Sequence, residues 1–469
     1  MITYQDLIAV GDNDRDRIDF VRSTIMSHKK SDAYLTAINA YEYDAKKNVT
    51  IMEYKKLLYT ISGETTPDNY SANYKITSAF FNRFIIQENQ YLLGNGVTWK
   101  NDSTADALGG NFDTVLQNLG HDALVGGQSF GFWNLDHVDN FSIKEFVPLY
   151  DEEDGAMKAG IRFWQMDNLK PLRATLYELD GYTDYIWKKG EDGEILHSKR
   201  AYVLKVKTSP ADGEQIYDYE NYPSFPIVPL WANPQKQSEL VGLREGIDAY
   251  DLIKSGFAND VDDASLIYWT INNAGGMDDR DLVEFVKHMK TVKAAVVDDT
   301  GAHAESHSID VPYNSRETLL SRLRADLYED AMALDTKSIA DGAVTATQIK
   351  AAYEPLNNKT DMYEYCIVEF ISKILELAGI EDEPTFTRSI IVNAQEEIGN
   401  VLQAADYLTT EYVTEKILRI LGDGDMADEM IEEIKKLQAE MALASLYQQE
   451  KQEEEEQEEK ETEEDSEEV

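Results

Sequence analysis

Two histidines, His303 and His307, have the spacing most typical of a metal site in this sequence. Histidines four residues apart can share a zinc ion when they lie on one face of a helix. The helical zinc-protease pattern also needs a glutamate directly after the first histidine, and this chain has Ala304 there. The segment AESHSIDV further favours an extended edge over a helix. We therefore expect surface histidines, with no metal and no cofactor.

Other patterns that carry catalysis are missing from the sequence. It contains no phosphate-binding glycine loop, no Gly-x-Ser-x-Gly turn and no catalytic Cys–His arrangement. The stretch DGDMAD at 423–428 lacks the ligand spacing and the closing glutamate of a calcium loop. Carboxylates are so numerous that no pair stands out as acid and base. We expect no catalytic residue, so function has to be sought in the arrangement of the elements.

The charge of the chain opposes tight DNA binding. The formal net charge of the 469 residues is −44, and residues 450–469 alone hold 13 acidic residues against 2 lysines. Proteins that read DNA sequence draw on Lys and Arg to displace counterions from phosphates, so an acidic body argues against this class of function. The glutamate-rich segment 450–469 cannot bury apolar surface, and we expect it to be disordered.

Composition also limits the architecture and the compartment. The length indicates two or more domains, and a hydrophobic content of 42% is enough for a sizeable core. The single cysteine, Cys366, excludes an intramolecular disulfide framework and suits a reducing compartment. No apolar run is long enough to span a membrane, and the first residues lack the pattern of a signal peptide. We expect a protein made in a cytoplasm, without membrane contact.

The first half of the chain combines helices with a sheet. Residues 1–61 have a mainly helical pattern with a turn at 43–47, which we interpret as a peripheral arm. Apolar residues then recur at helical spacing from Ile76 to Leu92, until Gly94 stops the helix. Short aromatic strands separated by DG turns follow as far as about residue 232. They predict an antiparallel meander packed on one side against the earlier helices.

Two long helices with a small insert between them come next. The segment SELVGLREGIDAYDLIKSGFAND predicts one helix, with Ser238 as its N-cap. A second helix follows Pro312, capped by Asn314 or Ser315, with apolar side chains every four residues at Leu319, Leu323 and Leu327. The residues between them read as a compact α/β insert. This predicts a hairpin of helices with a small folded tip, in a chain of the α+β class.

The last part of the chain is helical. The stretch KSIADGAVTATQIKAAYEPL runs from a loop of small residues into a long helical pattern that ends at Ala378. Pro355 lies inside this pattern and is expected to kink or divide the helix, because proline removes a backbone donor and clashes with the preceding turn. Two amphipathic helices are predicted at 393–421 and 425–447, with a GDGD break between them.

The order of these elements resembles the portal proteins of tailed bacteriophages, in particular the long-tailed branch. The resemblance covers approximately residues 70–380 and rests on four stretches that follow in the family's order. These are NYKITSAFFNRFIIQENQYLLGNGV, ALVGGQSFGFWNLD, PIVPLWANPQKQSELVGLREGIDAYD and GAVTATQIKAAYEPLNNK. Pro355 departs from the uninterrupted helix that the family leads us to expect.

The resemblance implies a mainly helical portal fold with named parts. A β-rich wing with its N-terminal helices would be 1–236, joined by a long kinked helix at 346–380. The stem helices would be 237–260 and 314–336, and the clip would be the α/β insert at 261–313. A helical crown would be 381–449, followed by the disordered acidic tail at 450–469.

The resemblance further implies a tunnel loop at 337–345 that projects towards the DNA axis. By position alone, its DNA-facing candidates are Lys337, Ser338, Asp341, Gly342 and Thr345.

The family's biology supplies the remaining expectations. The chain would form a homo-oligomeric ring of about twelve subunits at one capsid vertex of the virion, assembled in the bacterial host cytoplasm. Double-stranded DNA would pass through the ring without sequence-specific contacts. Its partners would be the terminase large subunit, a head-completion or adaptor protein, and the major capsid and scaffolding proteins. The resemblance implies no enzymatic activity.

Two other functions stay open at this point. One is another ring component, such as a head–tail adaptor, although adaptors are usually shorter and lack the hairpin of helices. The other is a metal-dependent DNA-processing enzyme that uses scattered carboxylates.

Overall fold

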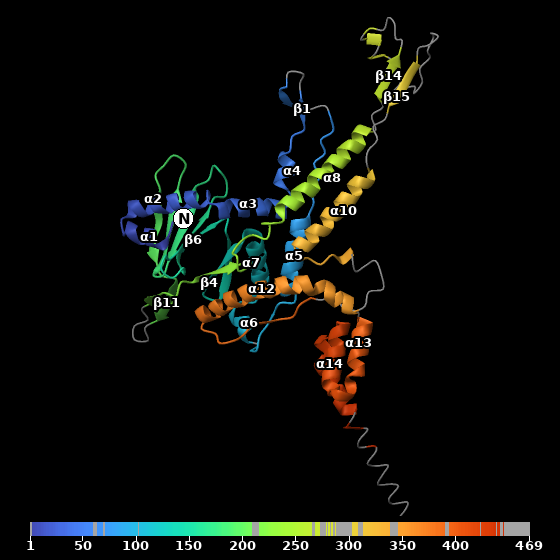
Figure 1. Ribbon diagram of the computed structural model, residues 1–469. Helices are drawn as coiled ribbons and strands as arrows, with labels where there is room; N and C mark the ends of the chain where they lie inside the picture. Colours follow the sequence, from blue (N-terminus) through green and yellow to red (C-terminus); the bar gives the residue numbers. More distant parts are fainter. Residues whose placement is uncertain are drawn as a thin grey trace, which may run out of the picture. The chain divides into compact units, whose positions relative to one another are not determined.

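The computed structural model describes most of the chain (Figure 1). The described residues are 2–59, 63–68, 71–101, 103–208, 215–264, 268–272, 303–307, 313–337, 346–389, 394–422 and 424–437, with single residues between 278 and 287 and at 439, 440 and 444. They form two compact units. The first comprises Met1–Leu334 and Pro355–Ser389, and the second Asp335–Glu354 and Ile390–Val469. Helices and antiparallel strands both occur, which confirms the predicted mixed class.

Four helices open the chain: α1 (Tyr4–Val10), α2 (Asp14–His28), α3 (Asp32–Asp44) and α4 (Val49–Glu53). The Asn13 side chain caps α2 by accepting from the Arg15 N–H, and Ser31 caps α3 in the same way. The predicted helices and the turn after Asp44 are confirmed. The interpretation as a peripheral arm is wrong, because Val21 and Ile25 are buried against a sheet.

Eight strands of the first unit form two sheets. One has the order β10-β9-β8-β7-β6 and is the predicted meander, and the other has the order β13-β4-β5. The bounds are β4 (Gln128–Asn134), β5 (His137–Ser142), β6 (Phe146–Tyr150), β7 (Met157–Trp164), β8 (Leu172–Glu178), β9 (Gly181–Trp187), β10 (Glu194–Arg200) and β13 (Ile227–Trp231). A single meander is therefore a wrong prediction, because β13 returns to pair with β4.

The two sheets pack face to face through aromatic side chains. Phe130 of β4 and Phe146 of β6 have ring centroids 4.5 Å apart, and Phe141 and Tyr177 extend the same cluster. The opposite face of the five-stranded sheet is covered by α1 and α2. This sheet is thus buried on both faces, and not on one as predicted. Strands β11 (Val203–Thr208) and β12 (Gln215–Glu220) form a separate hairpin.

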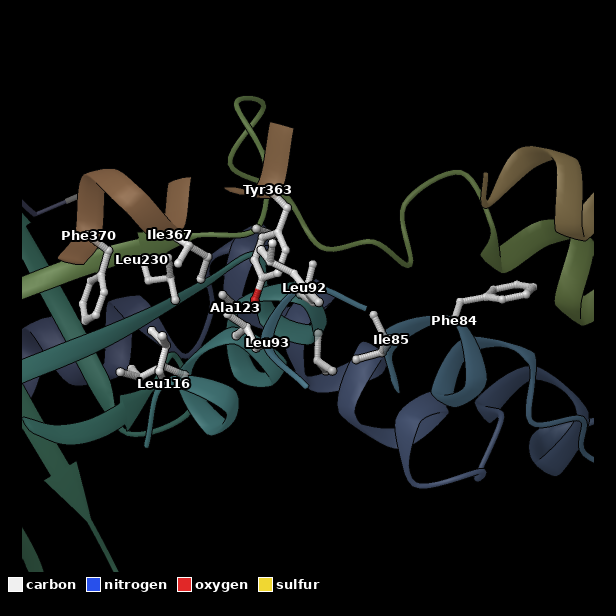
Figure 2. Packing of buried hydrophobic residues seen from close by; sticks show 14 of the residues in the cluster. Phe84, Ile85, Leu92, Leu93, Leu116, Ala123, Leu230, Tyr363, Ile367 and Phe370 are labelled. Atoms are coloured by element: carbon white, nitrogen blue, oxygen red, sulfur yellow. The ribbon is translucent and has the colours of Figure 1, made fainter. Parts of the chain in front are cut away.

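The largest core lies on the other side of the three-stranded sheet. It joins α5 (Phe80–Leu93), α7 (Phe112–Gly126) and the Pro355–Ala378 part of α12 (Ala346–Ala378). Figure 2 shows side chains from these helices and from β13 converging, among them Leu92, Leu116, Leu230, Ile367 and Phe370. Helix α5 ends before Gly94, as predicted, but begins at Phe80 instead of near Ile76.

Helices α8 (Arg244–Ala264) and α10 (Tyr313–Asp330) form the predicted pair. Helix α8 begins six residues after Ser238, because Gly242 adopts a φ of +90° that interrupts helical geometry. Helix α10 ends at Asp330, and Met332 has a φ of +51°. Between the two helices, β14 (Tyr268–Asn272) pairs antiparallel with β15 (His303–His307). The segment VKAAVVDD lies outside the described residues.

Helix α12 continues through Pro355, so of the two predicted effects the division of the helix does not occur, and the kink stays a prediction. One proline removes one backbone donor and leaves the other helical hydrogen bonds in place. The boundary between the two compact units nevertheless falls at this residue. Pro355 thus marks a boundary in the fold without ending the helix.

The second unit contains α13 (Ala394–Gln403), α14 (Thr410–Leu421) and a further helical stretch at 427–437. Its two short 3-10 turns are η1 (Ala405–Tyr407) and η2 (Gly424–Met426). The prediction of a single helix at 393–421 is wrong, because helix α13 ends at Gln403 and a new helix, α14, begins at Thr410. The Thr409 side chain caps α14 by accepting from the Tyr412 N–H. The acidic segment 450–469 lies outside the described residues.

The remaining elements of the first unit are short. They are α6 (Ser103–Ala107), the pair β1 (Leu57–Tyr59) and β2 (Thr65–Pro67), and the pair β3 (Val97–Thr98) and β16 (Thr385–Phe386). None of the described helices combines the length and the apolar character that crossing a membrane requires.

Candidate functional site: the helix hairpin and its base

The predicted DNA-facing loop is only partly described. Lys337 has an exposed side chain, and its backbone N–H donates to Oδ1 of Asp335 at 3.1 Å. Ser338, Asp341, Gly342 and Thr345 lie outside the described residues. The position of this loop relative to DNA therefore stays a prediction. Of the five candidate residues, Lys337 alone is among the described residues.

Helices α8 and α10 pack along each other in opposite directions. Away from the base of the hairpin, the rings of Phe257 and Tyr313 meet edge to face at 5.6 Å, and Arg316 forms an ion pair with Asp260. At the base, Gly246 packs closely against Leu327: a Cβ at Gly246 would come within 2.9 Å of Leu327 Cδ2, so the leucine side chain would have to shift. The hairpin is thus held by contacts at both ends.

One face of α8 is a row of polar side chains at helical spacing: Asp248, Asp251, Ser255 and Asn259. Each of them accepts a hydrogen bond from a segment early in the chain. Ser255 Oγ accepts from the Ile76 N–H at 2.9 Å, and Asn259 Oδ1 accepts from the Tyr74 N–H at 2.6 Å. Asp248 accepts from Thr50 Oγ1 at 2.6 Å. The stretch before α5 is therefore fixed along the hairpin.

Asp251 is the most buried member of this row. Its carboxylate accepts from the Ser78 N–H at 2.9 Å and from the Asn48 side-chain amide. Burial raises the pKa of Asp251, while the donors from Asn48 and Ser78 act in the opposite direction. The sequence shows this row only as polar residues on an amphipathic helix, a pattern that normally indicates a solvated face, so it was not predicted.

Lys359 of α12 occupies the base of the hairpin. Its Nζ lies 2.7 Å from Glu88 of α5 and 2.7 Å from Glu239, which precedes α8. The same ammonium donates to the backbone oxygen of Ala331, directly after α10, at 3.3 Å. The Lys359 side chain therefore contacts the segment before α8, the segment after α10, and α5.

This junction has more acid than base. Glu88 is almost completely buried, and burial raises its pKa to about 7, with Lys359 acting against this and Glu239 with it. A cavity of about 200 Å³ adjoins the three side chains and is also lined by Asp330 and Tyr363. Because a water molecule occupies about 30 Å³, the cavity has room for several. Protons can therefore exchange with the junction.

A second set of contacts fixes the end of α10 to α5. The Gln87 side-chain amide forms two hydrogen bonds of 3.0 Å with the backbone of Leu334, one in each direction. Arg83 also donates to the Tyr328 hydroxyl at 2.9 Å. The end of α10 is thus held in part independently of Lys359.

The suspected histidine pair is placed on a strand. His303 and His307 form the two ends of β15, opposite Asn272 and Tyr268 of β14. Four residues of strand span about 13 Å, which is too far for one metal ion to bind both by local spacing. This agrees with the expected extended edge. Among the described residues, no group of three or more acidic, His or Cys side chains has the geometry of a metal site.

Cys366 does not have the environment of a nucleophile. It is half-buried on α12, and burial raises the pKa of its thiol. Reactive cysteines have the opposite shift, because the thiolate is the reactive form.

Comparisons with known proteins agree on one family. The family model described as "Phage portal protein, SPP1 Gp6-like" matches residues 15–444. A protein named "Portal protein" from Clostridium phage phiCD119 is 25% identical over 366 residues, which cover 72% of this chain and 78% of that protein. Another "Portal protein", from Bacillus phage SPP1, is 22% identical over 391 residues, covering 74% and 73%.

Matches to solved structures have low identity and a low TM-score. A chain from the neck of a native GTA particle computed with C12 symmetry matches with a TM-score of 0.42 and 10% identity, over 72% of this chain and 89% of that chain. A chain from the virion of a native gene transfer agent particle matches with the same TM-score and identity, over 73% and 89%.

Proposed function

Because this chain belongs to the SPP1 Gp6-like family of phage portal proteins, we propose that it assembles into a ring at one vertex of a phage head, the channel through which the genome is packaged and ejected. The family match over residues 15–444 carries this proposal. It supports a location in the virion, and assembly would take place in the bacterial host cytoplasm. The ring would contain about twelve copies joined by head-to-tail interfaces. Such interfaces give a closed ring when the successive rotations from one subunit to the next add up to a full turn.

The parts of the fold receive the family's names within this proposal. The sheets and N-terminal helices (1–236), with the long helix at 346–380, form the wing. The stem comprises 237–260 and 314–336, in which α8 and α10 are the helices. The clip is 261–313 and the crown is 381–449, followed by the acidic tail at 450–469. The packing of α8 against α10 supports the paired stem.

The charge of the chain suits a passive channel. A net charge of −44 leaves few sites where phosphates could bind tightly, so DNA could move through without being held. The loop at 337–345 would approach the DNA, with Lys337, Ser338, Asp341, Gly342 and Thr345 as the facing residues. The exposed side chain of Lys337 is compatible with transient phosphate contacts.

The partners follow from the same proposal. The clip would bind the terminase large subunit during packaging and a head-completion or adaptor protein afterwards, and the major capsid and scaffolding proteins would be further partners. The sequence has no phosphate-binding loop, so the energy for packaging would come from the terminase. We propose no enzymatic activity, no cofactor and no membrane contact for this chain.

Imaging and mass measurement test the ring. Negative-stain images should show annular particles with a central hole, and native mass spectrometry should give about twelve times the 53.2 kDa chain. A monomer under all assembly conditions would contradict the proposal. Incubation with DNA and Mg²⁺ or Mn²⁺ tests the rival enzyme, which predicts cleavage that a single Asp or Glu substitution abolishes.

A further inference from the structure

The contacts of Lys359 connect four segments that are separate in the sequence. Glu88 belongs to α5, Glu239 precedes α8, Ala331 follows α10, and Lys359 itself belongs to α12. All of them are in the first compact unit. A helix hairpin can pivot if only one of its two helices is fixed at the base. Here the ammonium of Lys359 contacts both the segment before α8 and the segment after α10.

This lysine is not an ordinary surface residue. Only 13% of its side chain is exposed, and its partners Glu88 and Glu239 are 3% and 15% exposed. Breaking a buried ion pair by removing one partner is costly, because the remaining charge stays buried and unpaired. Loss of Lys359 would leave two carboxylates facing each other at the base of the hairpin. That repulsion is relieved either by a proton on Glu88 or by movement of the segment carrying Glu239 into solvent.

We propose that Lys359 is a positioning residue that couples both ends of the α8–α10 hairpin to α12, so that the hairpin and the Pro355–Ala378 part of α12 move as one body. The biological meaning rests on the proposed function: in a portal ring, a displacement of this part of α12 would be transmitted to the stem through this junction. The coupling is stronger at the α8 end, where the contact is an ion pair. It is weaker at the α10 end, where Gln87 and Arg83 also contribute.

Protonation should modulate this coupling. The titratable groups around the junction in the described part of the chain are Glu88, Glu239, Asp330, Lys359 and Tyr363. The Tyr363 hydroxyl donates to Asn89 at 3.1 Å, and burial keeps its pKa high, so it stays neutral. Below neutral pH a proton on Glu88 leaves one carboxylate for one ammonium. Above it, the surplus negative charge favours opening of the base.

Hydrogen–deuterium exchange on the purified full-length protein tests the coupling. The variants are Lys359→Met and the uncharged triple variant K359M/E88Q/E239Q, with Lys373→Met as the control. Lys373 lies on the same helix, half exposed, and pairs with Glu369 at 2.6 Å. Peptides covering 239–247 should exchange about tenfold faster in Lys359→Met, and those covering 327–334 should show a smaller rise. Peptides covering 394–421 should not change.

Three outcomes would overturn the proposal. They are unchanged exchange at both ends of the hairpin, an equal rise in all three regions, and the same pattern in the Lys373→Met control. If Lys359→Met does not fold, exchange in the same three regions is compared between the triple variant and the wild-type protein. The triple variant lacks Lys359 but leaves no unpaired charge at the junction.

A pH series adds a measurement on which a merely structural lysine would have no effect. In the wild-type protein, exchange at 239–247, corrected for the chemical rate, should rise from pH 6 to pH 8, and Glu88→Gln should remove this rise. A rise that persists in Glu88→Gln would contradict the proposal. Native mass spectrometry of the same samples scores the ring separately. Wild-type protein that never forms rings rejects the proposed function, whereas rings with unchanged exchange reject only the role of Lys359.

Discussion

The carboxylate of Asp251 in α8 accepts a 2.9 Å hydrogen bond from the backbone N–H of Ser78, far away in the sequence. Asp251 is completely buried, and Asn48 donates to the same carboxylate. The contact attaches the extended stretch before α5 to the middle of the hairpin. Helix α8 packs along α10, and this contact also joins it to the rest of the first unit.

Asp251→Ala should therefore destabilise the protein substantially. The substitution leaves the Ser78 N–H buried without an acceptor and removes one of the two acceptors of the Asn48 amide, at a cost of about 3 kcal/mol in the free energy of unfolding. Asp251→Asn keeps one acceptor oxygen and should cost less. Urea denaturation followed by circular dichroism measures both. Glu245→Ala, an exposed change on the same helix, is the control. Equal stability of Asp251→Ala and the control would show that this hydrogen bond is not needed.

Packing between α12 and the three-stranded sheet depends on Gly131. A Cβ at this position would come within 2.5 Å of Phe370 Cζ. Gly131→Ala should cost about 1–3 kcal/mol through overpacking, and Phe370→Leu in the same chain should recover part of it. Gly256→Ala in α8 has open space around its Cβ and should instead stabilise by up to about 1 kcal/mol. Thermal unfolding compares the three variants. If both alanine variants shift stability in the same direction, the steric explanation fails.

The junction at Lys359 makes the stability depend on pH through Glu88. Burial raises the pKa of Glu88 from its ordinary 4.5 to about 7, so between these values the folded protein binds more protons than the unfolded chain. The free energy of unfolding should fall as pH rises through this window, by an amount on the order of 3 kcal/mol. Glu88→Gln should remove this component. Urea unfolding at several pH values between 4.5 and 8 measures it.

The matched substitution in this series is Glu369→Gln. Glu369 is exposed on α12 and pairs with Lys373, so it should leave the slope with pH unchanged. If Glu88→Gln and Glu369→Gln have the same slope as the wild-type protein, Glu88 does not titrate in this window.

The sequence predicts those elements whose local pattern and burial agree. Helix α5 has apolar side chains at helical spacing and a glycine stop, and Tyr91 and Leu92 are buried as that pattern requires. The meander β6–β10 has short strands joined by tight turns, so neighbours in sequence are neighbours in the sheet. In these cases the signal lies within a few residues, and no distant partner has to be known.

The failures come from partners that are distant in the sequence. The return of β13 to β4 depends on aromatic packing between two sheets, and the local strand pattern is the same in either sheet. In the sequence, Asp251 and Lys359 look like ordinary polar surface residues. Their hydrogen-bond and ion-pair partners are distant in the sequence, and only the fold brings them together. The prediction of Ser238 as the N-cap of α8 is wrong because the helix begins at Arg244, and the Ser238 hydroxyl instead accepts from the Leu240 N–H and donates to the Val125 backbone oxygen.

Lys337 and the residues that follow it give the last prediction. Shortening 338–344 should leave the ring intact, because the contacts that hold the α8–α10 hairpin and the junction at Lys359 involve residues outside this loop. It should reduce packaging or retention of DNA, since the loop would no longer reach the channel. Lys337→Glu is the milder change. It should weaken retention in low salt and have little effect in high salt, because counterions screen phosphate contacts.

The two changes separate a loop that contacts DNA from one that only connects helices. The measurement is the amount of DNA protected from nuclease in filled particles, together with negative-stain images of the rings. Lys373→Glu places the same charge change at a half-exposed position of α12, remote in sequence from the loop, and should not alter retention. If Lys337→Glu retains DNA as Lys373→Glu does at every salt concentration, Lys337 makes no phosphate contact. If the shortened variant fails to form rings, the loop contributes to assembly, and its role in contacting DNA has to be abandoned.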